Sequence, residues 1–154
     1  MAHDPVLVTG ATGSVGRQVV EGLRAAGTPV RALTRTPDKA DLPPDVEVVG
    51  GDLGSARQTA PALDGVRRLY LFPAPELGGA LEAAVDAGVE HIVLLSSMAV
   101  TSGEGGSSAE KHLACERAVT ATGLPHTFVR AGAFMGNDLL WASQIQTVGA
   151  VSAP

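Results

Sequence analysis

The residues whose types and spacing most strongly suggest chemistry form one glycine-rich run, Thr9-Gly10-Ala11-Thr12-Gly13-Ser14-Val15-Gly16. The run follows a short apolar segment and precedes a segment with helical periodicity, which is the setting in which spaced glycines bind phosphate. Gly10 permits a tight turn, Gly13 lets the backbone approach a pyrophosphate, and Gly16 lets the helix pack closely on a sheet. The helix N-terminus adds free N–H groups and a positive dipole end. The run therefore predicts a dinucleotide phosphate site; the alternative is a glycine-rich turn with no ligand.

The residues after the second apolar segment bear on which dinucleotide would bind. A carboxylate at this point would accept a hydrogen bond from a ribose 2′-hydroxyl, as in NAD sites. Here the chain reads Leu33-Thr34-Arg35-Thr36-Pro37, and the first carboxylate is Asp38. Arg35 offers a guanidinium that can bond to a 2′-phosphate through two N–H groups. We therefore expect NADP(H) to be preferred, with NAD(H) still able to bind; alternatively, Arg35 is an ordinary solvated surface residue.

Short apolar runs alternate with longer helix-like segments along most of the chain. Strands are expected at Val6–Thr9, Val30–Thr34, Val46–Val49, Arg68–Phe72, His91–Ser96 and His126–Arg130. Helices are expected at Ser14–Ala26, Ser55–Leu63, Leu77–Ala87 and Ser107–Thr122, the last beginning with a Ser-x-x-Glu capping box. Such alternation predicts an α/β fold, a Rossmann-type doubly wound parallel sheet of about six strands with helices on both faces. Residues 1–130 would form this NAD(P)-binding domain, whereas 131–154 show no clear period.

Composition narrows the class of protein and of partner. The chain has 154 residues, the size of one domain, and 45% of them are hydrophobic. A net charge of −5 argues against direct nucleic-acid binding, which needs a basic surface. No apolar run approaches the roughly 18 residues that cross a bilayer, and the N-terminus does not resemble a signal peptide. Because Cys115 is the only cysteine, no internal disulfide can form; a cytoplasmic location and no metal site are expected.

The TGATGxxG form of the glycine run resembles the short-chain dehydrogenase/reductase superfamily, especially its extended and atypical branches. The resemblance implies that Asp52-Leu53, after the third strand, touches the adenine, although a turn or N-cap would also explain the aspartate. It further implies that Ser96 or Ser97 helps to bind substrate or nicotinamide, although serine is common at strand ends. Phe72-Pro73 follows the fourth strand, at the edge where ligands collect in such sheets. We expect this pair to line the ribose and nicotinamide side, the alternative being a simple strand stop.

Reductases of this superfamily usually carry Tyr-x-x-x-Lys on the helix after the fifth strand, and this chain does not. Its only tyrosine, Tyr70, lies in the fourth strand. The expected helix instead places Ser108, His112 and Glu116 at four-residue intervals, along one stripe. The usual proton donor is therefore absent, and a carbonyl-reductase assignment is weakened.

Three further patterns extend the resemblance over nearly the whole chain: H-x-x-x-E from His112, G-x-x-x-T-x-x-R from Gly123 and F-x-x-N from Phe134. With the glycine run they resemble the NmrA-like atypical short-chain dehydrogenases, and among these the NAD(P)H:quinone oxidoreductase type. By this match His112 stands where the usual lysine would be, and Ser108 where the tyrosine would be. The resemblance implies that His112 faces the ribose or nicotinamide, where it could donate a proton near neutral pH. Alternatively, His112 and Glu116 form a pair that only steadies the helix.

The resemblance implies an NADPH-dependent oxidoreductase that passes hydride to a quinone or similar small acceptor. Transfer to a quinone needs little acid–base help from the protein, so the missing Tyr-Lys pair counts less against this activity. The family also contains proteins that bind NADP(H) as a redox signal without turnover, and such a non-catalytic sensor or regulator is the alternative. An epimerase-like enzyme with bound NAD is disfavoured by Arg35 and by the missing pair.

Proteins of this family continue past the sixth strand into a smaller lobe that closes over the substrate. Residues 131–154 are therefore expected to be the start of a truncated substrate lobe, or a tail that contacts a partner. An apolar stretch in this segment could form a helix over the sheet edge; its members are Phe134, Met135, Leu139, Leu140, Trp141 and Ile145. Apolar surface left open by a missing lobe favours self-association, so a homodimer is expected.

Overall fold

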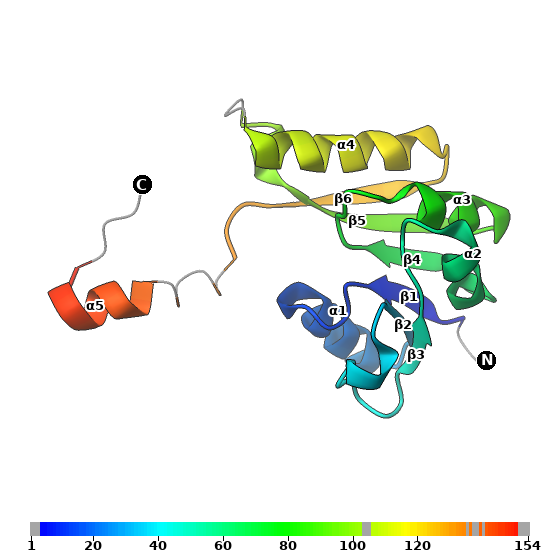
Figure 1. Cartoon of the computed structure of the whole chain (residues 1–154), viewed down its shortest axis with the longest axis horizontal. Helices are drawn as coiled ribbons and strands as arrows, with labels where there is room; N and C mark the ends of the chain where they lie inside the picture. The colour runs from blue at the N-terminus through cyan, green and yellow to red at the C-terminus, as the bar shows by residue number, and fades with distance from the viewer. Residues whose placement is uncertain (1–3, 103–105, 135, 137–138, 140, 151–154) are drawn as a thin grey trace.

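A computed structural model of the chain describes residues 4–102, 106–134, 136, 139 and 141–150. Within these residues six parallel strands form one sheet in the order β3-β2-β1-β4-β5-β6 (Figure 1). The strands are β1 (Val6–Thr9), β2 (Val30–Thr34), β3 (Glu47–Gly50), β4 (Arg68–Leu71), β5 (His91–Ser97) and β6 (His126–Ala131). The predicted parallel sheet is confirmed, and the order of its strands reverses between β1 and β4, where such folds bind ligands.

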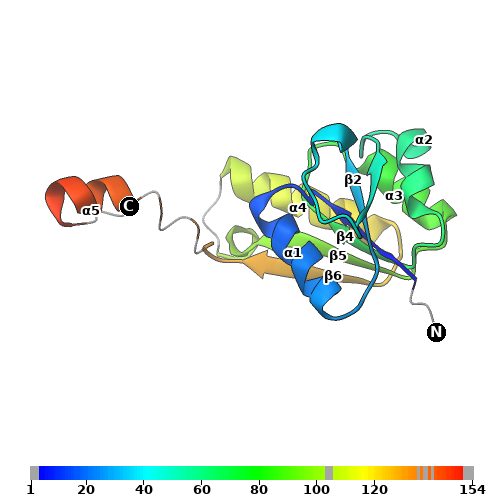
Figure 2. The ribbon, with the colours of Figure 1, turned by 90° about the horizontal axis from the view of Figure 1, so that it is seen from below.

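Helices cover both faces of the sheet, as predicted. On one face lies α1 (Ser14–Ala25); on the other lie α2 (Ala56–Thr59), α3 (Gly78–Asp86) and α4 (Ser107–Ala121) (Figure 2). Three short 3₁₀ turns complete this part of the fold: η1 (Pro37–Lys39), η2 (Ala60–Leu63) and η3 (Met98–Val100).

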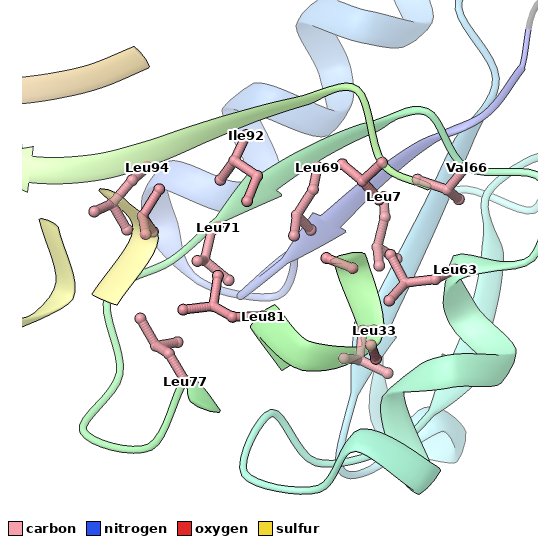
Figure 3. Close-up of a cluster of buried hydrophobic side chains, with 14 of the residues drawn as sticks. Leu7, Leu33, Leu63, Val66, Leu69, Leu71, Leu77, Leu81, Ile92 and Leu94 are labelled. Atoms are coloured by element: carbon pink, nitrogen blue, oxygen red, sulfur yellow. The ribbon is translucent and has the colours of Figure 1, made fainter. Parts of the chain in front are cut away.

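The apolar strands supply two cores because successive side chains of a strand point to opposite faces. The core beneath α3 and α4 includes Leu7, Leu71 and Leu94, all fully buried (Figure 3). The core beneath α1 includes Val8 and Ala32, which are also fully buried. Each buried leucine contributes roughly 1.5–3 kcal/mol relative to an exposed one. The sheet is therefore a rigid platform for whatever lies at its edge.

Two local predictions were wrong. The single helix expected at Ser55–Leu63 is divided into α2 and η2, because Pro61 has no N–H to continue the α-helical hydrogen bonds. The helix α4 begins at Ser107 as expected, but its N-cap is Gly106 and no side chain caps it. Ser107 is already inside the helix, so the predicted capping box does not form.

The segment after β6 contains a further helix, α5 (Ala142–Val148), which ends at Gly149 in the left-handed conformation. Figures 1 and 2 show α5 apart from the sheet, so this helix does not cover the sheet edge, and contact with a partner stays a prediction. The helix and the residues before it carry exposed apolar side chains, with Val148 of α5 76% exposed and Leu139 78% exposed. None of the helices in the described part of the chain is long and apolar enough to cross a membrane.

Tyr70 lies in β4 on the α1 face and is 8% exposed. Its hydroxyl is buried and has no hydrogen-bond partner among the described residues, and burial raises its pKa. A buried hydroxyl without a partner costs about 1–3 kcal/mol, so we expect Tyr70→Phe to raise the free energy of unfolding by about 1 kcal/mol. Urea denaturation measures this change. A loss of stability of similar size would show that the hydroxyl is bonded in the folded chain.

Candidate functional site

The glycine-rich run forms the turn between β1 and α1. Gly10 has a positive φ of 62°, and its carbonyl accepts a hydrogen bond of 3.0 Å from the N–H of Gly13. A Cβ added at Gly16 would lie 2.0 Å from that same carbonyl oxygen, so only glycine lets the helix approach this closely. Gly13 is the N-cap of α1, and no side chain bonds to the helix N-terminus. The predicted tight turn and close approach are therefore both present; phosphate binding itself stays a prediction.

Arg17 joins this loop to the segment that follows β2, a contact that the sequence did not predict. Its Nε donates to the carbonyl of Thr12 at 3.2 Å, and its Nη1 donates to the carbonyl of Asp41 at 2.7 Å. Asp41 has a positive φ of 44°, which is uncommon for a residue other than glycine. The phosphate loop and the loop after β2 are thus held together by one side chain.

The residues predicted for the adenosine side lie at the carboxyl ends of β2 and β3. Arg35 is exposed and has no hydrogen bond or ion pair within the described part of the chain. The Asp52 carboxylate accepts a hydrogen bond of 2.8 Å from the N–H of Gly54, which is the turn role given above as the alternative. Leu53 is half-buried against the core, and its carbonyl accepts a bond of 2.8 Å from the N–H of Ala80.

A cleft of about 1550 Å³ runs from the N-terminus of α1 across the ends of β4 and β5 to α4. Of the residues predicted to bind a cofactor, six line it: Ser14, Val15, Phe72, Pro73, Ser96 and His112. Ser108 and Lys111 of α4 also line it, as do Phe134 and Leu139 after β6. The other eight predicted cofactor residues lie outside this lining: Gly10, Ala11, Thr12, Gly13, Gly16, Arg35, Asp52 and Leu53. The phosphate loop and α4 therefore share one cavity.

Phe72 sits against the turn of the phosphate loop. A Cβ added at Gly10 would lie 2.8 Å from the Cβ of Phe72, so the glycine is needed for this contact as well as for its positive φ. The backbone N–H of Phe72 donates to the Oγ1 of Thr9 at 2.8 Å, and the side chain is 40% exposed. The hydrogen bond and the close contact hold the Phe72 side chain beside the cleft.

His112 lies in the wall of the cleft, and its Nδ1 is buried with no hydrogen-bond partner among the described residues. Glu116, one turn further along α4, directs its carboxylate elsewhere. Its Oε1 accepts from the Oγ of Ser96 at 2.6 Å and from the Nε of Arg130 at 2.9 Å; its Oε2 accepts from the Nη2 of Arg130 at 2.7 Å. Glu116 therefore bonds to Ser96 and Arg130, while the charge of His112 acts on it electrostatically, so a role of the His112–Glu116 pair in steadying the helix stays a prediction. Among the described residues no group of three or more acidic, histidine or cysteine side chains could hold a metal ion.

The Glu116 contacts have a consequence for stability against pH. The hydrogen bonds from Arg130 outweigh burial and hold the pKa of Glu116 below its ordinary value of 4.5; the Ser96 hydroxyl and the charge of His112 act in the same direction. A lowered carboxyl pKa stabilises the fold above the unfolded-state pKa, and this stability is lost as the pH falls through the folded-state pKa.

We therefore expect the free energy of unfolding of the wild type to exceed that of Glu116→Gln at neutral pH. The difference should shrink below pH 4.5, the ordinary pKa of the group. Urea denaturation over a series of pH values measures it, and a difference that does not change with pH would contradict this account.

Two of the similar curated proteins are reductases. The chain is 41% identical, over 96% of its length, to a (4-alkanoyl-5-oxo-2,5-dihydrofuran-3-yl)methyl phosphate reductase from Streptomyces griseus subsp. griseus, of which it covers 54%. It is 31% identical, over 97% of its length, to an NAD(P)H azoreductase from Xenophilus azovorans, of which it covers 55%. The chain thus spans about half the length of the curated relatives it matches.

The fold is shared with an NADPH-dependent quinone oxidoreductase from Escherichia coli whose structure was solved with NADPH. The two superpose with a TM-score of 0.83 at 28% identity, covering 94% of this chain and 54% of that one. The expected resemblance to this type of protein is confirmed. A family model described as NAD(P)H-binding matches residues 10–149, a range that includes the glycine run, the cleft and α4. On this match the chain belongs to the NAD(P)H-binding family.

Proposed function

We propose that this chain is the cofactor-binding part of an NADPH-dependent oxidoreductase that reduces a quinone or a similar small acceptor. One observation carries the proposal: a single cleft of about 1550 Å³ joins Ser14 and Val15 of the phosphate loop to His112 on α4. Pockets for small ligands usually measure roughly 300–1,000 Å³, so this cleft has room for part of a dinucleotide and a small acceptor side by side. A hydride donor and its acceptor need to share one cavity of this kind.

The cofactor would lie across the point where the strand order reverses, with its adenosine half over β2 and β3 and its nicotinamide half over β4 and β5. Two observations support this fit. Gly16 lets the loop pack within 2.0 Å of where a Cβ would stand, and Gly13, the N-cap of α1, has no side chain to occupy the helix N-terminus where a pyrophosphate would bind. The Nδ1 of His112 is a buried polar atom with no partner in the described part of the chain, in the wall where the ribose or nicotinamide would lie.

The residues of the site would have distinct roles. The backbone of Gly10–Gly16 would hold the pyrophosphate, and Asp52-Leu53 would meet the adenine. Phe72-Pro73 would cover the ribose and nicotinamide and keep water away from them. Arg35, which is exposed and pairs with no other described residue, would bind the 2′-phosphate and favour NADP(H) over NAD(H). Ser96 would act indirectly, because its hydroxyl is already bonded to Glu116.

When bound, NADPH supplies the hydride, and the chain supplies position and hydrogen bonds. His112 would bond to the ribose or to the acceptor oxygen that gains a proton. The relatives are named for a dihydrofuranone phosphate, for azo compounds and for quinones, which are conjugated acceptors. We propose that the acceptor of this chain is of the same conjugated kind.

A spectrophotometric assay tests this proposal by following the loss of NADPH absorbance with a panel of quinones. We expect saturable turnover that depends on the quinone and that falls in His112→Ala. The matched control is His91→Ala, because His91 lies at the opposite end of β5 from the cleft. Tight NADPH binding with no turnover on any acceptor would contradict the proposal, and would favour a non-catalytic NADP(H) sensor.

We propose that residues 131–154 begin a substrate lobe or contact a partner, and that the chain forms a homodimer through this region. The exposed side chains of Leu139 and Val148 support an apolar contact there. Analytical ultracentrifugation tests the dimer, and a chain that stays monomeric at high concentration would contradict it.

A cytoplasmic location is proposed because the single cysteine, Cys115, is free and buried.

A further inference from the structure

Glu116 is the only charged side chain among the buried residues of the described part of the chain, at 4% exposed. Its carboxylate accepts three hydrogen bonds, one from Ser96 and two from Arg130. Ser96 lies near the end of β5 and Arg130 near the end of β6, whereas Glu116 belongs to α4. One carboxylate therefore joins three separate elements, and we call these three residues the Glu116 cluster.

Each of the three elements passes directly from the Glu116 cluster into the wall of the cleft. Ser97 follows the serine of the cluster, Ala131 follows its arginine, and His112 lies one helical turn before its glutamate. All three of these neighbours line the cleft. The cluster thus sits behind the half of the cleft that lies over β5, far along the sheet from Arg35 at the end of β2. A shift of any one element would move part of that wall.

Apolar packing and strand pairing also hold these elements, since Ala118 of α4 and Phe128 of β6 pack against the core and β6 pairs with β5. Besides Glu116, α4 buries only Cys115 and Val119 among its described residues. β6 is the outer strand of the sheet, paired on one side to β5, and its Val129 is 46% exposed. The bonds to a charged carboxylate are roughly twice as strong as bonds between neutral groups. The ion pair of Arg130 with Glu116 therefore adds a strong polar attachment of β6 to α4.

We propose that Glu116 is a positioning residue that fixes the nicotinamide half of the cleft, through Ser96 and Arg130, while the adenosine half forms independently of it. This inference rests on the proposed function, because it requires a dinucleotide in the cleft. Gln at position 116 keeps the shape of the side chain and an acceptor for Ser96. It removes the charge that holds Arg130, so β6 keeps its pairing with β5 but loses this attachment to α4 beside the wall residues.

Calorimetric titration of Glu116→Gln with two ligands tests the inference. NADPH carries both halves of the dinucleotide, whereas 2′,5′-ADP carries the adenosine half and the 2′-phosphate without nicotinamide. We expect the affinity for NADPH to fall about tenfold and that for 2′,5′-ADP to stay within about twofold. A residue that only stabilises the fold would weaken both ligands in equal proportion or neither, and either result would overturn the inference.

Milder variants keep the test decisive if Glu116→Gln folds poorly. Ser96→Ala removes one bond of the cluster. It is expected to lower the affinity for NADPH by a smaller factor than Glu116→Gln does, and to leave the affinity for 2′,5′-ADP nearly unchanged. Arg130→Lys keeps the positive charge and is expected to retain more NADPH affinity than Arg130→Met. An equal fold-change in affinity for both ligands across these variants, or no change for either, would also overturn the inference.

A second ion pair with the same two-bond geometry supplies the matched control. Arg24 donates to the Asp45 carboxylate at 2.8 and 2.7 Å, far from the cleft lining. Asp45→Asn is expected to leave both affinities unchanged. A wild-type chain that binds neither ligand would contradict the proposed function and this inference together. Wild-type binding of both ligands, with a proportionate loss in Glu116→Gln, would overturn this inference alone.

Discussion

Alanine at position 16 is expected to abolish useful NADPH binding, because the added Cβ would lie 2.0 Å from the carbonyl oxygen of Gly10 and 2.7 Å from its carbonyl carbon. Both are backbone atoms, so the contact is relieved only by moving the phosphate loop away from α1. Overpacking of this kind costs about 1–3 kcal/mol of stability, and a displaced cradle would raise the Kd for NADPH on the order of 100-fold. Fluorescence titration of the folded variant with NADPH measures the change.

Gly22 is the matched control on the same helix. A Cβ there would meet nothing within 4 Å, and alanine in a helix interior is favoured over glycine by about 0.5–1 kcal/mol. Gly22→Ala should therefore raise the free energy of unfolding and leave the Kd for NADPH unchanged. If Gly16→Ala and Gly22→Ala bound NADPH equally well, the turn between β1 and α1 would not be the phosphate site.

Replacement of Arg35 by alanine is expected to weaken NADPH selectively. The guanidinium is exposed and makes no hydrogen bond or ion pair within the described residues, so its loss removes no internal contact. Hydrogen bonds to charged groups are worth about 1.5–3 kcal/mol, which corresponds to about a 10- to 100-fold rise in the Kd for NADPH. NADH has no 2′-phosphate, so its affinity should stay the same, and the ratio of the two affinities is the quantity to measure.

Arg57 offers the control for charge, because it is an exposed arginine on α2. Arg57→Ala removes the same charge from the chain and should leave the preference for NADPH intact. If Arg35→Ala weakened NADPH and NADH by the same factor, the residue would have no role in choosing the cofactor. A wild-type chain that bound NADH as tightly as NADPH would lead to the same conclusion.

The elements of the sheet could be predicted from the sequence because the signals that define them are local. Apolar runs bounded by glycine and proline located each strand to within one or two residues of its observed ends. The prediction of one helix at Ser55–Leu63 was wrong because Pro61 divides the segment into α2 and η2. This division could have been predicted, since the proline is visible in the sequence. The position of α5 could not be predicted from the sequence, because it depends on tertiary packing and not on the spacing of apolar residues.

The glycine roles in the site could be predicted for the same reason: each follows from backbone geometry a few residues away. The Glu116 cluster could not, because Arg130 lies 14 residues beyond Glu116 and meets it only when β6 pairs with β5 beneath α4. The matching G-x-x-x-T-x-x-R pattern marked Arg130 without giving it a partner. The contact of Arg17 with Asp41 crosses 24 residues and was missed in the same way.

The central claim is that a dinucleotide binds across the carboxyl edge of the sheet, from the loop after β2 to α4. Titration of the isotope-labelled chain with NADPH, followed through backbone amide NMR shifts, tests it most directly. The account predicts saturable shifts at Gly10–Gly16, at Arg35 and at His112, all with one Kd. No saturable shift, or shifts confined to α5 and its neighbours, would contradict it.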